Sequence, residues 1–172
     1  MLNVLALTAY ALALAAAAAS DLFRYQIPNA LSLVIAGAFA LAAFDLPLAT
    51  TAWHLSAGIV VFAITAPLFH FGILGGGDVK LMAATTLWMG WHELFAFVAV
   101  TAIVGGVIAA GLLLIRRAAP SPVPADRWYA RLLSPKEGVP YGIAISASGL
   151  FMLPQLATAE HVRSALSQLH GA

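Results

Sequence analysis

The stretch that decides the fold is VKLMAATTLWMGWHELFAFVAVTAIVGGVIAAGLLLI, residues 79–115. It is apolar almost throughout, and the main exceptions are Lys80 and the segment Gly90-Trp91-His92-Glu93. A helix needs about 20 apolar residues to cross the hydrocarbon core of a bilayer, so one helix of this length would overshoot it. The polar segment and its interfacial aromatic residue predict two crossings, at residues 79–91 and 94–115. The first is short and requires tilt or local thinning of the bilayer.

The composition of the whole chain agrees with a membrane protein. Its 172 residues are 62% hydrophobic and 9% charged, whereas soluble domains carry about 25% charged residues. The same length criterion predicts further spans at residues 2–20, 27–44, 53–71 and 139–156. We therefore predict an all-α polytopic membrane protein, a bundle of six transmembrane helices forming a single membrane-embedded domain over residues 1–172. No cysteine is present, which excludes disulfides and thiol nucleophiles.

The distribution of basic residues predicts the orientation of this bundle, because cytoplasmic loops are enriched in Lys and Arg. With six spans and the amino terminus outside, only Arg163 falls on the outer side. The other seven basic residues share the cytosolic side: Arg24, Lys80, Arg116, Arg117, Arg127, Arg131 and Lys136. We therefore expect a multi-pass protein of the inner (plasma) membrane, with both termini outside and a cytosolic loop at about residues 116–138. No basic residue precedes Arg24, so we expect a retained first helix rather than a secretory signal.

Two acids lie at the cytosolic ends of apolar stretches, at similar predicted depth. Asp21 ends the first stretch, and Asp78 follows the glycine run Gly75-Gly76-Gly77. A carboxylate at a membrane boundary is costly, which marks it as a functional candidate. Two neighbouring carboxyl groups share one proton near neutrality, so one can activate water while the other protonates a peptide carbonyl. The alternative is structural: Asp78 as a helix cap, and Asp21 paired with Arg24.

Helix position suggests a role for each acid. Asp21 lies at a helix end, where the dipole disfavours a carboxylate, and Asp78 lies at a helix start, where it is favoured. Our hypothesis is that Asp78 is more often the ionised base and Asp21 the protonated acid. Glycines lack Cβ, so the run before Asp78 lets the backbone approach a substrate or a neighbouring helix closely.

Three further residues are candidate supports for the site. Pro28 suits the first turn of the second helix, and Asn29 either orients a carboxylate or caps that helix. Lys80 either lowers the pKa of an acid or contacts a lipid phosphate. The five histidines show no ligand spacing, so we expect neither a metal nor a cofactor. They are His54, His70, His92, His161 and His170.

The segments around the two acids, Asp21-Leu22-Phe23-Arg24-Tyr25-Gln26-Ile27-Pro28-Asn29 and Gly75-Gly76-Gly77-Asp78-Val79-Lys80-Leu81, resemble the type IV prepilin peptidases, membrane aspartic proteases of the GxGD type. The segment Val139-Pro140-Tyr141-Gly142-Ile143-Ala144 resembles the start of that family's last helix. The resemblance implies that Asp21 and Asp78 are the catalytic pair. It also implies that Gly75 and Gly77 are the motif glycines.

The resemblance further implies a pilin-like precursor as substrate, cleaved at the cytosolic face. The leader that is removed is short and basic, and it directly precedes the apolar helix of the pilin. Dual-function members also methylate the new amino terminus and carry a large cytosolic insert, usually with paired cysteines. This chain has neither feature, so we expect no N-methyltransferase activity. In this respect it is similar to the short enzymes of Flp (tight-adherence) pilus systems.

Two other functions are open at this point. Presenilin-like and signal-peptide-peptidase-like proteases share the GxGD motif but carry a late Pro-Ala-Leu motif, where this chain has Leu153-Pro154-Gln155-Leu156. A small transporter or non-catalytic assembly subunit could use the two acids as an ion or proton relay. A relay usually shows polar residues at several depths, yet these spans are dominated by Ala, Leu, Val and Ile. The formal net charge of +1 gives no indication of a nucleic-acid partner, and none is expected.

Overall fold

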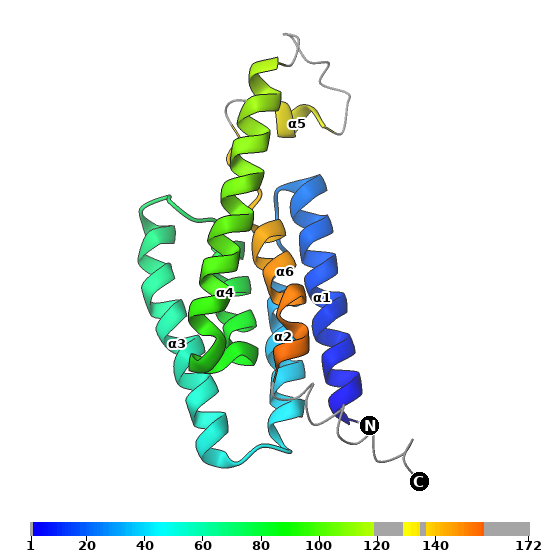
Figure 1. The fold of residues 1–172 in the computed structure, drawn as a ribbon, viewed down its shortest axis with the longest axis vertical. Helices are drawn as coiled ribbons and strands as arrows, with labels where there is room; N and C mark the ends of the chain where they lie inside the picture. The colour runs from blue at the N-terminus through cyan, green and yellow to red at the C-terminus, as the bar shows by residue number, and fades with distance from the viewer. Residues whose placement is uncertain (1, 119–128, 135–136, 157–172) are drawn as a thin grey trace.

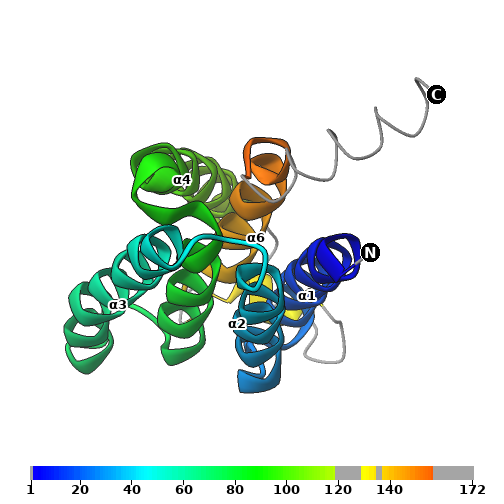
Figure 2. The same ribbon diagram turned by 90° about the horizontal axis from the view of Figure 1, so that it is seen from below.

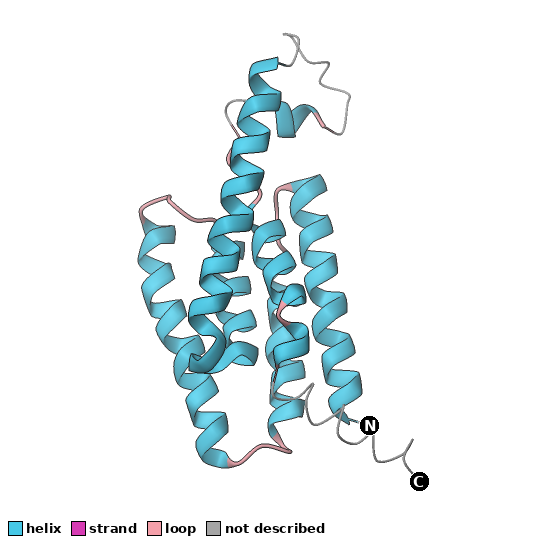
Figure 3. Cartoon of the chain, in the orientation of Figure 1, coloured by secondary structure: helices cyan, strands magenta, loops and turns pink. Residues whose placement is uncertain are grey.

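The computed structural model describes residues 2–118, 129–134 and 137–156, and within these ranges it contains helices and no strand (Figures 1 and 3). The predicted all-α architecture is therefore confirmed. The predicted positions of Arg127, Lys136 and Arg163 lie outside the described residues. The elements are α1 (Leu2–Arg24), α2 (Asn29–Ala43), α3 (Leu48–His70), α4 (Gly76–Ala118), α5 (Ala130–Leu133), α6 (Tyr141–Phe151) and the 3₁₀ helix η1 (Leu153–Gln155).

Proline marks the start of three of these helices. Pro28, Pro47 and Pro140 directly precede α2, α3 and α6, with φ of −59°, −56° and −73°. The pyrrolidine ring fixes φ near the helical value and has no N–H, so it suits a helix start. Pro28 thus lies one residue before α2 rather than inside its first turn. α3 begins at Leu48, earlier than the predicted span, because hydropathy alone does not register the polar first turn after Pro47.

Helix α4 is interrupted at Gly90, which has φ +60° and ψ −167°. Asp78 and Met82 line the same cavity as Ala102 and Val98, so the arms before and after Gly90 run side by side in opposite directions (Figure 1). The break falls inside the predicted polar segment. By length and hydropathy, α1, α3 and α4 are the described helices that could cross a membrane. The count of six crossings stays a prediction.

The break in α4 is held by the side chain of His54. Its Nδ1 lies 2.8 Å from the carbonyl oxygen of Leu87, so it satisfies a carbonyl group close to the point where the helical hydrogen-bond pattern stops. A Cβ at Gly90 would come within 2.9 Å of His54 Cε1. Glycine is required at this position for two reasons: the backbone has a positive φ, and the His54 ring leaves no space for a Cβ.

The core joins α1, α2, α4 and α6 around Tyr10 and Trp88, whose ring centroids lie 4.6 Å apart. Trp88 Nε1 donates to the Ile35 carbonyl at 3.0 Å, and the Tyr10 hydroxyl donates to the Gly149 carbonyl at 3.3 Å. Both bonds satisfy buried polar groups within an apolar cluster. In Figure 2, α6 lies between α1 and α4, with which it is packed. This packing fixes where α1 ends relative to the start of α4.

Candidate active site

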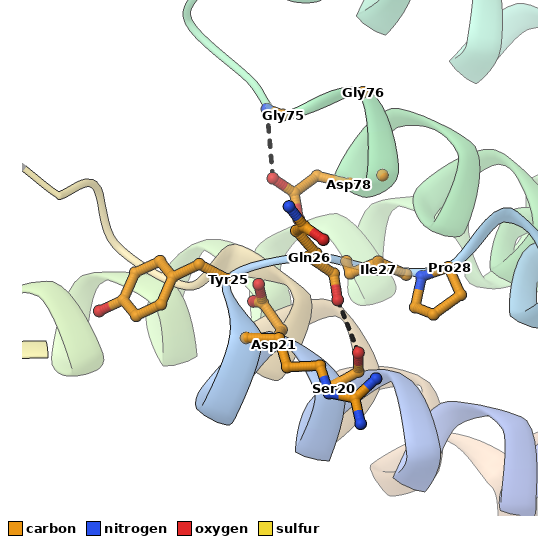
Figure 4. A pocket seen from close by; sticks show the side chains of 11 residues that line it. Ser20, Asp21, Tyr25, Gln26, Ile27, Pro28, Gly75, Gly76 and Asp78 are labelled. Atoms are coloured by element: carbon orange, nitrogen blue, oxygen red, sulfur yellow. Dashed lines mark hydrogen bonds between the residues drawn. The ribbon is translucent and has the colours of Figure 1, made fainter. Parts of the chain in front are cut away.

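A cleft of about 490 Å³ opens at the end of the bundle where the α1–α2 and α3–α4 connections meet. Asp21, in the last turn of α1, and Asp78, in the first turn of α4, both line it. Figure 4 shows the two carboxyl groups on either side of this cleft. The structure thus brings together two acids from separate connections. The other lining residues are Ser20, Arg24, Tyr25, Gln26, Ile27, Pro28, Gly75, Gly76 and Gly77.

The carboxyl group of Asp21 is buried, with 6% of the residue exposed. It faces the backbone amides of Gly142 and Ile143 at the start of α6. Its Oδ2 atom has no hydrogen-bond partner within the described part of the chain. A Cβ at Gly142 would lie 2.8 Å from this oxygen, so only glycine leaves space for the carboxyl group. The free amides of a helix start favour an anion.

Asp78 accepts a hydrogen bond from the Gly75 N–H at 3.2 Å. An acid that reaches back to the amide preceding its helix makes one half of a capping box. The predicted cap role is therefore real, but it coexists with exposure of the carboxyl group to the cleft. A Cβ at Gly75 would lie 2.7 Å from Asp78 Oδ2, and a Cβ at Gly77 would lie 2.9 Å from Ile27 Cβ. The two glycines are thus needed for different reasons.

The two carboxyl groups lie close enough for their charges to interact. In the described residues, the ion pairs join His92 to Glu93 and Arg131 to Glu137, and neither includes Asp21 or Asp78. The predicted alternative pairing of Asp21 with Arg24 is not formed. The start of α6 gives Asp21 the kind of amide environment that the start of α4 gives Asp78. The position of each aspartate on its own helix therefore does not indicate which of the two is the general acid and which is the general base.

The predicted supporting residues divide between two places. Pro28 lines the cleft. Lys80 donates from Nζ to Asn29 Oδ1 at 2.9 Å, and these two side chains line a neighbouring groove instead of the cleft. Asn29 is the first residue of α2, which follows Pro28 as the N-cap, and its Oδ1 is bound by Lys80 instead of by a backbone amide of that helix. His70 ends α3 and does not line the cleft.

Sequence reasoning missed Ile27 and Tyr25, which line the cleft, and Arg131, which contacts Tyr25. Ile27 contacts the positions of both Gly77 and Gly142, so it spaces α4 from α6. Tyr25 directly follows α1 and has the left-handed backbone conformation, with φ +54°. The Arg131 guanidinium lies 5.3 Å from the centroid of the Tyr25 ring. The sequence offered little indication of a role for Tyr25, because its position directly after a helix can be recognised only once the end of α1 is known.

Arg131 connects the short helix α5 to the end of α1. Its Nη1 donates to the Arg24 carbonyl oxygen at 2.9 Å, and its Nε donates to Glu137 at 3.2 Å. An arginine that binds a free helix-end carbonyl and covers an aromatic ring holds that end in place. Burial raises the pKa of the Tyr25 hydroxyl, and the charge of Arg116 opposes this effect. The connection between α4 and α6 therefore braces the turn that carries Asp21.

The fold and the cleft together define a helical membrane protein with two aspartates facing one cavity at one end of its bundle. Among the described residues, no group of three or more His, Asp or Glu side chains could hold a metal ion. Residues 8–110 match the type IV leader peptidase family, and this match covers more than half of the chain. The chain belongs to that family. No curated protein and no solved structure matches it.

Proposed function

We propose that the protein is an aspartic endopeptidase that removes the leader from type IV pilin-like precursors at the cytosolic face of the plasma membrane. The observation that carries this proposal is the shared cleft. Two carboxyl groups from turns far apart in the chain face one cavity, and neither is neutralised by an ion pair in the described residues. Membership in a leader peptidase family supports the choice of reaction.

The mechanism follows from two acids that share one proton. The ionised carboxylate takes a proton from water as the water oxygen attacks the peptide carbonyl carbon. The protonated acid donates its proton to the carbonyl oxygen. The tetrahedral intermediate then collapses, the C–N bond breaks, and the leaving nitrogen receives the proton that the base took from water. As the carbonyl group re-forms, one hydroxyl of the intermediate returns a proton to the other carboxylate. Each aspartate returns to its initial state, so no cofactor is consumed.

The orientation and the absence of methyl transfer are part of the same proposal. The cleft lies at the end of the bundle that carries Arg24, Arg116 and Arg131, which is the cytosolic end by the distribution of basic residues. The connection between α1 and α2 is only a few residues long, and the chain has no cysteine. Both features support a peptidase without N-methyltransferase activity.

The decisive experiment is co-expression with a type IV pilin precursor and comparison of the native protein with Asp21→Asn and Asp78→Asn. Either substitution removes an ionisable proton site with little change in size, so leader removal should fall below detection. Asp45→Asn is the matched control, because Asp45 lies in the α2–α3 connection and binds Asn3 at 3.0 Å. Normal processing by either cleft variant would exclude that aspartate from catalysis. Proton-coupled transport without any cleavage would instead favour the relay function.

A further inference from the structure

A second, mainly apolar groove of about 530 Å³ lies between α2, α3 and α4. We propose that it binds the apolar helix of the substrate, directly following the scissile bond, as that helix enters the membrane. This inference rests on the proposed function and names the surface that would select its substrate. In Figure 2 the first arm of α4 lies between α2 and α3, and it forms the floor of the groove.

The walls of the groove are regular helix faces. α2 contributes Asn29, Ser32, Leu33 and Ala36, and α4 contributes Lys80, Ala83, Ala84 and Leu87. Both sets follow the spacing i, i+3, i+4, i+7, which is one face of a helix over two turns. Each face is roughly 10 Å long at 1.5 Å per residue. Gly58, Ile59 and Phe62 of α3 complete the groove.

The groove begins where the cleft ends. Pro28 lines the cleft and Asn29 lines the groove, while Asp78 lines the cleft and Lys80 lies two residues further along α4. The hydrogen bond from Lys80 to Asn29 spans this junction. A polypeptide held between the two aspartates therefore continues directly into the groove.

The lining suits a closely packed apolar helix. Leu33, Ile59 and Phe62 are 71%, 66% and 46% exposed, which leaves an apolar wall uncovered. Ala36, Ala83 and Ala84 also line the groove. Residues this small let the backbone of a helix approach closely.

Ser32 provides an independent sign of a polar partner. It is only 7% exposed and lines the groove, yet its Oγ has no hydrogen-bond partner in the described part of the chain. An unsatisfied buried hydroxyl is costly. The first turn of a helix carries backbone N–H groups without partners, and rotation of the buried Ser32 side chain toward the groove lets its Oγ accept from such a group. An acyl chain has no polar group to offer at this depth.

The first test fills the groove. Ala36→Leu adds bulk to its wall, whereas Gly37→Leu on the same helix faces open space, because a Cβ at Gly37 meets nothing within 4 Å. Two substrates are compared: a full pilin precursor and a short soluble peptide that spans the cleavage site. We expect Ala36→Leu to lower the precursor-to-peptide ratio of kcat/KM by about tenfold, and Gly37→Leu to leave this ratio unchanged. Equal ratios in the two variants would overturn the groove assignment while leaving the peptidase intact.

The second test uses the absence of cysteine from the natural chain. Leu33→Cys and Phe62→Cys, each in the Asp78→Asn background, are paired with precursors that carry a single cysteine in the apolar helix. Ile103→Cys is the control, since this exposed position lies outside the groove. Disulfide formation should occur at the two groove positions and not at the control. Crosslinking no stronger than the control would show that lipid alone fills the groove. If the native protein cleaves neither substrate, the proposed function fails and the groove assignment falls with it.

Discussion

Gly142 lies against the carboxyl group of Asp21, although α6 and α1 come from opposite ends of the chain. The contact places the free amides of the α6 start beside the acid at the end of α1. A carboxyl group that would otherwise be buried without a partner thereby gains an electrostatically favourable neighbour. Helix α6 is thus part of the candidate active site, although the match to the leader peptidase family ends at residue 110.

The first prediction concerns this contact. Gly142→Ala places a Cβ about 2.8 Å from Asp21 Oδ2, so the carboxyl group must move. We expect kcat for leader removal to fall by about tenfold or more, since small displacements of reacting groups are costly. Gly138→Ala is the control, because a Cβ there meets nothing within 4 Å. Equal activity of the two variants would show that Asp21 does not depend on the shape of the α6 start.

The second prediction separates the motif glycines by mechanism. Gly75→Ala places a Cβ too close to the Asp78 carboxyl group, whereas Gly77→Ala places a Cβ too close to Ile27. Only glycine at position 27 removes the Cβ atom that a side chain at position 77 would meet, so Ile27→Gly should lessen the effect of Gly77→Ala and not that of Gly75→Ala. The measurement is leader cleavage by the two single variants and by each combined with Ile27→Gly, compared with Ile27→Gly alone. Rescue of both variants, or of neither, would contradict the two separate roles.

The third prediction tests the brace formed by α5. Arg131→Gln removes the charged donor to the Arg24 carbonyl and the cation above the Tyr25 ring. Contacts of this kind at exposed sites are worth about 1 kcal/mol, so we expect kcat to fall by about fivefold. Arg117→Gln, an exposed position at the end of α4, removes the same charge and should have little effect. A similar decrease in both variants would point to general electrostatics.

The fourth prediction concerns stability at the break in α4. Gly90→Ala forces a side chain into a positive φ and against the His54 ring. We expect a loss of about 1–3 kcal/mol in the free energy of unfolding, measured as a lower Tm in detergent. Gly111→Ala is a suitable control, since a Cβ there meets open space. An unchanged Tm for Gly90→Ala would show that α4 can straighten without cost.

The sequence by itself determined the class of the protein, the break in α4 and the two acids of the cleft. These features are local: apolar runs, a polar interruption and a carboxylate at the end of an apolar stretch follow from composition and chain length. The sequence did not determine the residues at which the helices end. The apolar run stops at Ser20, but α1 continues to Arg24, because hydropathy marks the lipid-facing part of a helix and not its last turn.

Only the tertiary structure decided which groups lie near the acids and which face other surfaces. The pairing of Lys80 with Asn29, the position of Gly142 beside Asp21 and the reach of Arg131 to Arg24 join residues that are distant in the chain. Such contacts depend on how each helix is rotated about its axis when it packs. That rotation is set by the whole core at once, chiefly around Tyr10 and Trp88, and no local pattern encodes it.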